Sequence, residues 1–97
     1  MRDEPEVLAE AQEELEEALA WYRERNPRAA AGLLAELRTA VTRIRTMPWT
    51  WPEDAAGTRR VLLHRFPYKL VYRVTEERLV IVALAHQKRE PGYWRFR

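Results

Sequence analysis

The dipeptide Asn26–Pro27 separates two stretches whose apolar residues recur at helical spacing. Asparagine is a favoured N-cap and proline fits the first helical position, so a new helix is predicted to begin here. The stretch before it is clearly helical from about Ala11. Because no residues are left for a longer connection, the two helices must form an antiparallel hairpin.

Each predicted helix has one apolar face. In the first helix this face contains Leu8, Ala11, Leu15, Leu19 and Tyr22. Acidic residues lie on the other side, and we expect them to be solvated: Glu13, Glu14, Glu16 and Glu17. In the second helix the apolar stripe contains Ala30, Leu33, Leu34, Leu37, Val41, Ile44 and Met47. This helix should end before Pro48, since a residue that precedes proline disfavours helical geometry.

Beyond a loop that begins at Pro48, the apolar pattern changes from helical to alternating spacing. Residues 60–65 are predicted to form a strand that Phe66–Pro67 ends, and residues 68–74 a second strand. Residues 79–86 are almost continuously apolar, which is typical of a central strand covered on at least one face. The short segment of residues 6–9 fits either a strand or the start of the first helix.

These elements predict an α+β fold, in which an N-terminal antiparallel helical hairpin packs on a three- to four-stranded, largely antiparallel sheet. No repeat, linker or low-complexity tract interrupts the chain, so residues 1–97 are predicted to form a single domain.

The net charge of +2 hides a strong asymmetry along the chain. Residues 1–26 hold nine acids and three bases, a net charge of −6, whereas residues 59–97 hold three acids and ten bases, a net charge of +7. A basic C-terminal half favours an anionic partner, either a nucleic acid or an acidic protein segment.

Several classes of protein are disfavoured by composition. The chain has no cysteine and only two histidines, so we expect no disulfide and no metal site. The three glycines form no phosphate-cradling loop, and no cofactor is expected. No apolar stretch is long enough to cross a membrane and the N-terminus does not resemble a secretory signal, so a cytoplasmic protein without a membrane partner is the expectation.

The residues His86, Lys88, Arg89, Tyr93 and Trp94 cluster where the third predicted strand ends. His86 has the chemistry of a general acid or base, but a histidine with no motif partner more often closes a strand through a backbone hydrogen bond. Tyr93 and Trp94 could stack on a nucleic acid base or fold back as an apolar clasp. We expect the clasp for Trp94 and leave the role of Tyr93 open.

The remaining candidates are cations on the strands and tryptophans in the loop. Adjacent antiparallel strands bring same-face residues close together, so several cations could converge on one anion. A solvated basic face is the alternative. The cations are Arg59, Arg60, Arg65, Lys69, Arg73, Arg78, Lys88 and Arg89. Among the other side chains, His64 is expected at the surface, and Trp49 and Trp51 are expected to pack against the core.

Three segments together resemble the RelE/ParE superfamily of bacterial toxins, the toxic halves of type II toxin–antitoxin modules. The segments are the loop W-x-W-P, the strand R-F-P-Y-x-L-V-Y-R and the ending A-H-x-x-R-x-P-x-Y-W. They follow two helices, and the resemblance covers the chain from about Glu6 to Trp94. It implies growth inhibition and a cognate antitoxin, with an acidic and partly disordered tail that could cover the basic residues.

The resemblance implies two alternative targets. ParE-like members bind DNA gyrase and have no established catalytic triad, and the long helical hairpin and His86 favour this branch. RelE-like members enter the ribosome and cleave mRNA without a metal. Under that alternative the catalytic residues would be His86, Arg89, Tyr93, Arg60 and Lys69.

Two observations bear on this choice. The spacing of Tyr93 from Arg89 departs from the nuclease pattern, and the chain has too few lysines to copy lysine-rich nuclease sites. A degenerate member that only binds its antitoxin is a third possibility. In each case the residues expected to bind the target or another anion are Arg60, Arg65, Lys69, Arg73, Lys88 and Arg89.

Overall fold

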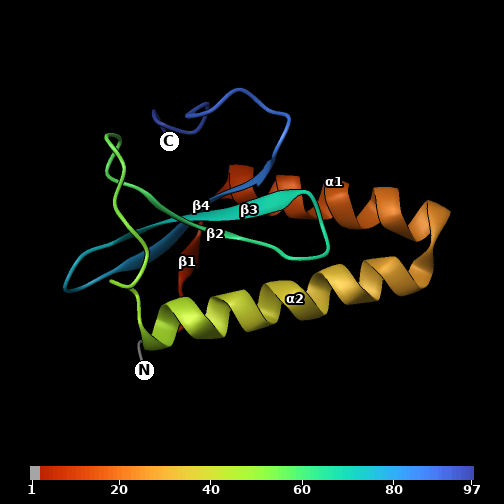
Figure 1. The fold of residues 1–97 in the computed structure, drawn as a ribbon, viewed down its shortest axis with the longest axis horizontal. Coiled ribbons are helices and arrows are strands. Elements are labelled where there is room, and N and C mark those ends of the chain that lie inside the picture. The colour runs from red at the N-terminus through yellow and green to blue at the C-terminus, as the bar shows by residue number, and fades with distance from the viewer. Residues whose placement is uncertain (1–2) are drawn as a thin grey trace.

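The computed structural model describes residues 3–97 as two helices and a four-stranded sheet (Figure 1). The elements in chain order are β1 (Glu6–Val7), α1 (Ala9–Arg25), α2 (Pro27–Thr46), β2 (Arg59–Leu62), β3 (Tyr68–Val74) and β4 (Leu79–His86). The strand order is β1-β4-β3-β2, with β1 parallel to β4 and the other two pairs antiparallel. The predicted α+β fold with a largely antiparallel sheet is confirmed, and the short segment at residues 6–9 supplies both β1 and the first residue of α1.

The helical hairpin forms where the sequence predicts it. The Asn26 side chain accepts hydrogen bonds from the backbone N–H groups of Arg28 at 3.1 Å and Ala29 at 3.4 Å, which caps α2. Leu33 and Ile44 on the predicted stripe are fully buried. Met47 is an exception, because α2 ends at Thr46 and the non-helical backbone of Met47 leaves its side chain 61% exposed.

Strand β2, the first strand after the helices, ends earlier than the predicted span of residues 60–65. It ends at Leu62, so His64 and Arg65 lie in the loop before β3. The Glu36 carboxylate accepts hydrogen bonds from the backbone N–H groups of both residues, the one from Arg65 at 3.3 Å, and so holds the chain away from a straight strand. The exposed position predicted for His64 is confirmed.

The sheet is covered on both faces. The face that packs on the helices, here called the helix face, contains Leu70 and Tyr72 of β3 together with Ile81 and Leu84 of β4. Val71 points to the opposite face, here called the outer face. The register between β3 and β4 shifts between Val71, which pairs with Ala83, and Tyr72, which pairs with Ile81. This bulge places the extra residue, Val82, with Ala83 on the outer face.

The C-terminal segment, residues 87–97 after β4, covers the outer face. In Figure 1 the sheet lies between α2 and this segment, drawn in blue. Trp94 is 1% exposed and packs on Val71, Val82, Ala83 and Ala85. Its indole N–H donates to the Thr58 hydroxyl at 3.2 Å, which in turn donates to the Asp54 carboxylate at 2.7 Å. The apolar clasp predicted for Trp94 is confirmed.

The two loop tryptophans differ from each other. Trp51 packs on the core with its ring edge-on to that of Tyr72 at a centroid distance of 6.5 Å, as predicted. Trp49 was expected to pack in the same way, but it is 52% exposed. Its ring lies 5.4 Å from the Arg59 guanidinium, a surface contact that leaves most of the indole accessible.

Among the described residues, no helix is long and apolar enough to cross a membrane.

Trp94→Ala should destabilise the fold by about 3–5 kcal/mol, because it opens a large cavity over the outer face. Trp94→Phe should cost less, since it keeps most of the apolar contact although it loses the hydrogen bond to Thr58. The measurement is the free energy of unfolding in guanidinium chloride. Trp21→Ala is the matched control, because Trp21 is exposed on α1. Equal losses for Trp21→Ala and Trp94→Ala would contradict the clasp.

Candidate functional site

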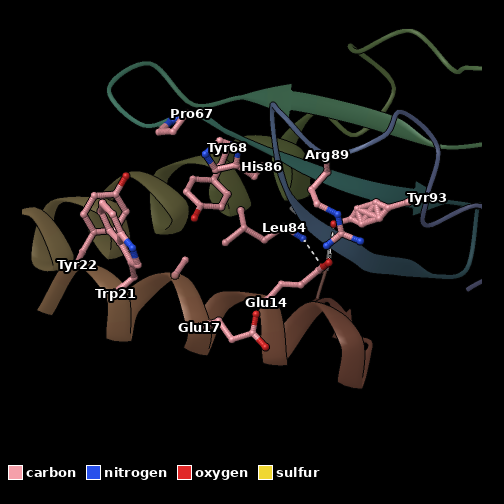
Figure 2. A pocket seen from close by; sticks show the side chains of 11 residues that line it. Glu14, Glu17, Trp21, Tyr22, Pro67, Tyr68, Leu84, His86, Arg89 and Tyr93 are labelled. Atoms are coloured by element: carbon pink, nitrogen blue, oxygen red, sulfur yellow. Dashed lines mark hydrogen bonds between the residues drawn. The ribbon is translucent and has the colours of Figure 1, made fainter. Parts of the chain in front are cut away.

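A cleft of about 440 Å³ lies between α1 and the end of the sheet at which β3 begins and β4 ends (Figure 2). It is here called the α1–β4 cleft. The helix contributes Glu14, Glu17, Ala18, Trp21 and Tyr22; the opposite wall contributes Pro67, Tyr68, Leu84, His86, Arg89 and Tyr93. Three residues predicted from the C-terminal motif, His86, Arg89 and Tyr93, therefore come together here, beside aromatic rings of α1 and β3.

The Glu14 carboxylate connects the parts of the cleft. Its Oε1 accepts hydrogen bonds from the backbone N–H of Leu84 at 3.1 Å and from the Arg97 guanidinium at 2.9 Å. Its Oε2 accepts from the Tyr93 hydroxyl at 2.5 Å and from Arg97 at 3.1 Å. The charge is thus matched by four donated hydrogen bonds. Helix, strand and C-terminal segment are joined through this one side chain, which Figure 2 shows between Leu84 and Tyr93.

The expectation that Glu14 is solvated was wrong, because its side chain is only 14% exposed. One sequence signal for this position was available. Glu14 lies three residues after Ala11 and four before Ala18, both of which are buried, so the three share a side of the helix. Arg97, its partner, had no recognisable signal, since it belongs to no periodic element.

The hydroxyl of Tyr93 is held in its protonated form. Burial raises the pKa of Tyr93 well above its ordinary value, and the hydrogen bond that it donates to the Glu14 carboxylate raises it further. The Arg89 guanidinium lies 3.9 Å from the centre of the Tyr93 ring. Because the hydroxyl proton is bound to a carboxylate, Tyr93 is poorly placed to transfer protons to a substrate.

His86 closes β4 through the backbone. Its ring Nδ1 accepts a hydrogen bond from the N–H of Lys88 at 3.0 Å, and the ring lies edge-on to Tyr68 at 5.0 Å. A nitrogen that accepts a hydrogen bond carries no proton, so the neutral ring is protonated at Nε2. The lone pair that a general base needs is therefore already in use.

Arg60 and Lys69 lie elsewhere, on the outer face. They line a second hollow of about 800 Å³ beside β2. Lys69 pairs with Ala85 and Tyr68 pairs with His86, so Lys69 and His86 are neighbours in register but point to opposite faces of the sheet. The Lys69 amino group lies 5.2 Å from the Trp94 ring, and burial together with the charge of Arg60 lowers the pKa of Lys69.

The other predicted anion-binding cations join neither the residues of the α1–β4 cleft nor the pair Arg60 and Lys69. Arg65 forms an ion pair with Glu36 at 3.8 Å in the loop before β3. Arg73 is half-buried on β3 and donates to the backbone carbonyl of Arg97 at 3.0 Å. Lys88 is exposed in the turn after β4. The structure thus divides the predicted cations among several places and does not form one basic groove.

The α1–β4 cleft has the properties of a binding surface. Its aromatic side chains offer apolar contact, while Glu17 and Arg89 offer charge at the rim. Among residues 3–97, no group of three His, Asp or Glu side chains is arranged to hold a metal ion. Of the groups that could move protons, His86 accepts a backbone hydrogen bond at Nδ1 and Tyr93 donates its hydroxyl proton to Glu14.

Comparisons with known proteins agree with the geometry. A family model described as "ParE toxin of type II toxin-antitoxin system, parDE" matches residues 6–91. Ten chains of solved structures match, among them one titled "Chromosomal ParDE TA system from P. aeruginosa". The TM-score to that chain is 0.70 at 17% sequence identity, and the match covers 86% of this chain and 96% of that chain. This likeness concerns the fold. No curated protein sequence matches the chain.

Glu14→Gln should lower the free energy of unfolding by about 2 kcal/mol, because a neutral amide cannot pair with Arg97 and its nitrogen cannot accept a hydrogen bond. Glu17→Gln is the matched control on the same helix. Glu17 is exposed, so its substitution should change stability by no more than about 0.5 kcal/mol. Chemical denaturation of both variants makes the comparison, and similar losses for the two would show that Glu14 has no special role.

The stability of the protein should fall as the pH rises above about 10, because the unfolded chain then releases the Tyr93 proton and the folded chain retains it. Below that pH both states keep the proton and the contribution is fully present. Tyr93→Phe should flatten this alkaline decline. Some slope will remain, since burial also raises the pKa of Tyr68, and raises that of Tyr72 to about 12. Unfolding free energies measured on both sides of pH 10 make the test, and identical slopes would contradict it.

Proposed function

The chain belongs to the family of ParE toxins of type II toxin–antitoxin systems, and from this premise we propose that it inhibits bacterial growth by binding DNA gyrase in the cytoplasm. A cognate antitoxin neutralises it. The family match over residues 6–91 carries this proposal, together with the matching two-helix and four-strand fold. Gyrase is the target that resemblance to ParE-like toxins implies.

The division of the candidate residues between two faces supports binding over catalysis. A metal-independent nuclease needs a base, an acid and cations around one phosphate. Here His86, Arg89 and Tyr93 line the α1–β4 cleft, while Arg60 and Lys69 line the hollow beside β2. A single scissile phosphate cannot contact both sets while the sheet lies between them.

The charge distribution supports an acidic antitoxin segment. Arg60 and Lys69 on the outer face and Lys88 and Arg89 after β4 would be covered by such a segment as it folds on binding. Arg65 and Arg73 contribute positive charge nearby although each has a contact within the chain. The toxin would then be held in a complex in resting cells, and free toxin would expose these cations.

Induction of the protein in a bacterial host should arrest growth and activate the DNA-damage response, because a poisoned gyrase leaves broken DNA. Purified protein should inhibit supercoiling by purified gyrase. The measurements are colony counts, a damage-responsive reporter and a supercoiling assay. Prompt cleavage within translated mRNA, with normal supercoiling, would refute gyrase as the target and indicate a ribosome-dependent nuclease. Uninterrupted growth would indicate a degenerate antitoxin-binding protein.

Two alanine variants separate the mechanisms further. Lys69→Ala and His86→Ala remove groups that a nuclease would use, from the outer face and the cleft respectively. Any loss of growth arrest in either variant should be no larger than the accompanying loss of folded protein accounts for. Co-expression of the product of an adjacent antitoxin-like gene should restore growth. Loss of toxicity in both variants, with antitoxin binding retained, would favour catalysis.

A further inference from the structure

Two concavities meet at the end of the molecule where α2 runs into the loop that leads to β2, at the left of Figure 1. One is a pit of about 240 Å³ formed by the last turn of α2 and the following loop, with Thr42, Thr46, Met47 and Thr50 in its wall. The other is the hollow of about 800 Å³ beside β2. Both are lined by Arg43 and Trp51, so the two concavities form one continuous surface.

The hollow is positively charged. Arg43, Arg60 and Lys69 line it, and among residues 3–97 no acidic group forms an ion pair with any of the three. Two acids line it as well. Glu53 is paired with Arg59 at 3.4 Å, a cation just outside the hollow. The hollow therefore keeps an excess of cations.

Asp54 is the second acid, and hydrogen bonds within its loop hold its carboxylate in place. It accepts hydrogen bonds from the N–H groups of Ala56 at 2.9 Å and Thr58 at 3.0 Å, and from the Thr58 hydroxyl at 2.7 Å. Burial alone would raise the pKa of this carboxyl, but these hydrogen bonds and the charge of Arg60 hold it below its usual range. Asp54 thus shapes the loop and offsets part of the charge of Arg60, while Arg43 and Lys69 keep the hollow positive.

The pit is apolar and is bordered by exposed apolar side chains. Met47 in its wall is exposed, as is Trp49 in the same loop, and Leu62 of β2 is exposed in the wall of the hollow. Tryptophan, methionine and arginine are the residues that concentrate at the centres of protein–protein interfaces. Exposed apolar groups at the border of a cationic hollow are suited to a ligand that is itself apolar on one side and acidic on another.

The loop that carries these groups is held in place before any ligand arrives. The Tyr72 hydroxyl donates to the Pro48 carbonyl at 2.7 Å from inside the core. The Arg59 guanidinium donates to the Trp51 carbonyl at 2.5 Å. A surface fixed in this way loses little conformational entropy when a partner binds.

The tryptophan rings argue against single-stranded nucleic acid as the ligand. A base stacks on an open aromatic face. Here Arg43 lies 5.1 Å from the centre of the Trp51 ring, and Arg59 lies 5.4 Å from that of Trp49. The cations that would bind phosphates are thus placed over the rings that would bind bases.

We propose that the pit and the hollow form one docking site for an acidic, amphipathic segment of a partner protein. An apolar side chain of that segment enters the pit beside Met47 and Trp51, and its carboxylates meet Arg43, Arg60 and Lys69. The assignment deepens the proposed function and rests on it only for the source of the segment. The site itself is defined by charge and shape.

The test uses fluorescence anisotropy of the full chain with a labelled peptide of about fourteen residues, in which leucines recur at helical spacing among glutamates. The wild-type protein should bind this peptide, and less tightly as salt is added. Arg60→Glu should weaken binding by about tenfold or more, because it reverses a charge in the hollow. Met47→Ser should weaken it by about threefold, because it removes apolar surface at the pit.

Matched controls lie outside the site. Arg38→Glu makes the same charge reversal on an exposed position of α2, and Phe96→Ser removes an exposed apolar side chain from the C-terminal segment. Both should bind the peptide as wild type does, and circular dichroism should show all four variants folded.

Three outcomes would overturn the docking site. They are absence of peptide binding, equal weakening by Arg38→Glu and Arg60→Glu, and tighter binding of an oligouridylate that displaces the peptide. None of them bears on growth arrest or on gyrase inhibition, so the docking site and the proposed function can fail separately.

Discussion

The Glu14 carboxylate is the contact on which the arrangement of the cleft depends. An ionised side chain that is largely removed from water must have its charge matched by donors, and Glu14 has them from β4, from Tyr93 and twice from Arg97. Satisfying this carboxylate therefore also fixes how α1 sits against the sheet and where the C-terminal segment returns. The same bond that places Tyr93 in the cleft prevents its hydroxyl from acting as a base.

Secondary structure and topology could be predicted from the sequence because local signals for them are strong. Asn26–Pro27 marks the hairpin, and the change to alternating apolar residues marks the sheet. The predictions failed where long-range contacts override local pattern. Glu36, from the middle of α2, ends the strand expected to continue to Arg65, and this contact cannot be read from neighbouring residues. Met47 differs, because Pro48 already marks the end of α2, and it was placed on the apolar stripe although the helix ends before it.

The candidate site was harder to predict, since it depends on which face of the sheet each side chain occupies. The sequence indicates that His86, Arg89, Arg60 and Lys69 are strand or strand-end residues with useful chemistry. Which of them share a face depends on the strand register, which in turn includes the bulge between Val71 and Tyr72. The C-terminal segment adds Arg97, whose role needs the tertiary structure, because nothing in its sequence surroundings distinguishes it from the other arginines.

The alternation of side chains along a strand also limits which groups of this sheet can act on one ligand. Lys69 and His86 are separated by one position in the β3–β4 register, and a strand directs successive side chains to opposite faces. Bringing the two groups to one phosphate would require a shift by one residue, which would also turn Leu70 and Tyr72 out of the core. The packing that stabilises the fold therefore keeps the Lys69 amino group and the His86 imidazole apart. With the groups held on two sides of a covered sheet, each can contribute to a separate binding surface. Under the function proposed above, one such surface would meet the target and the other the antitoxin.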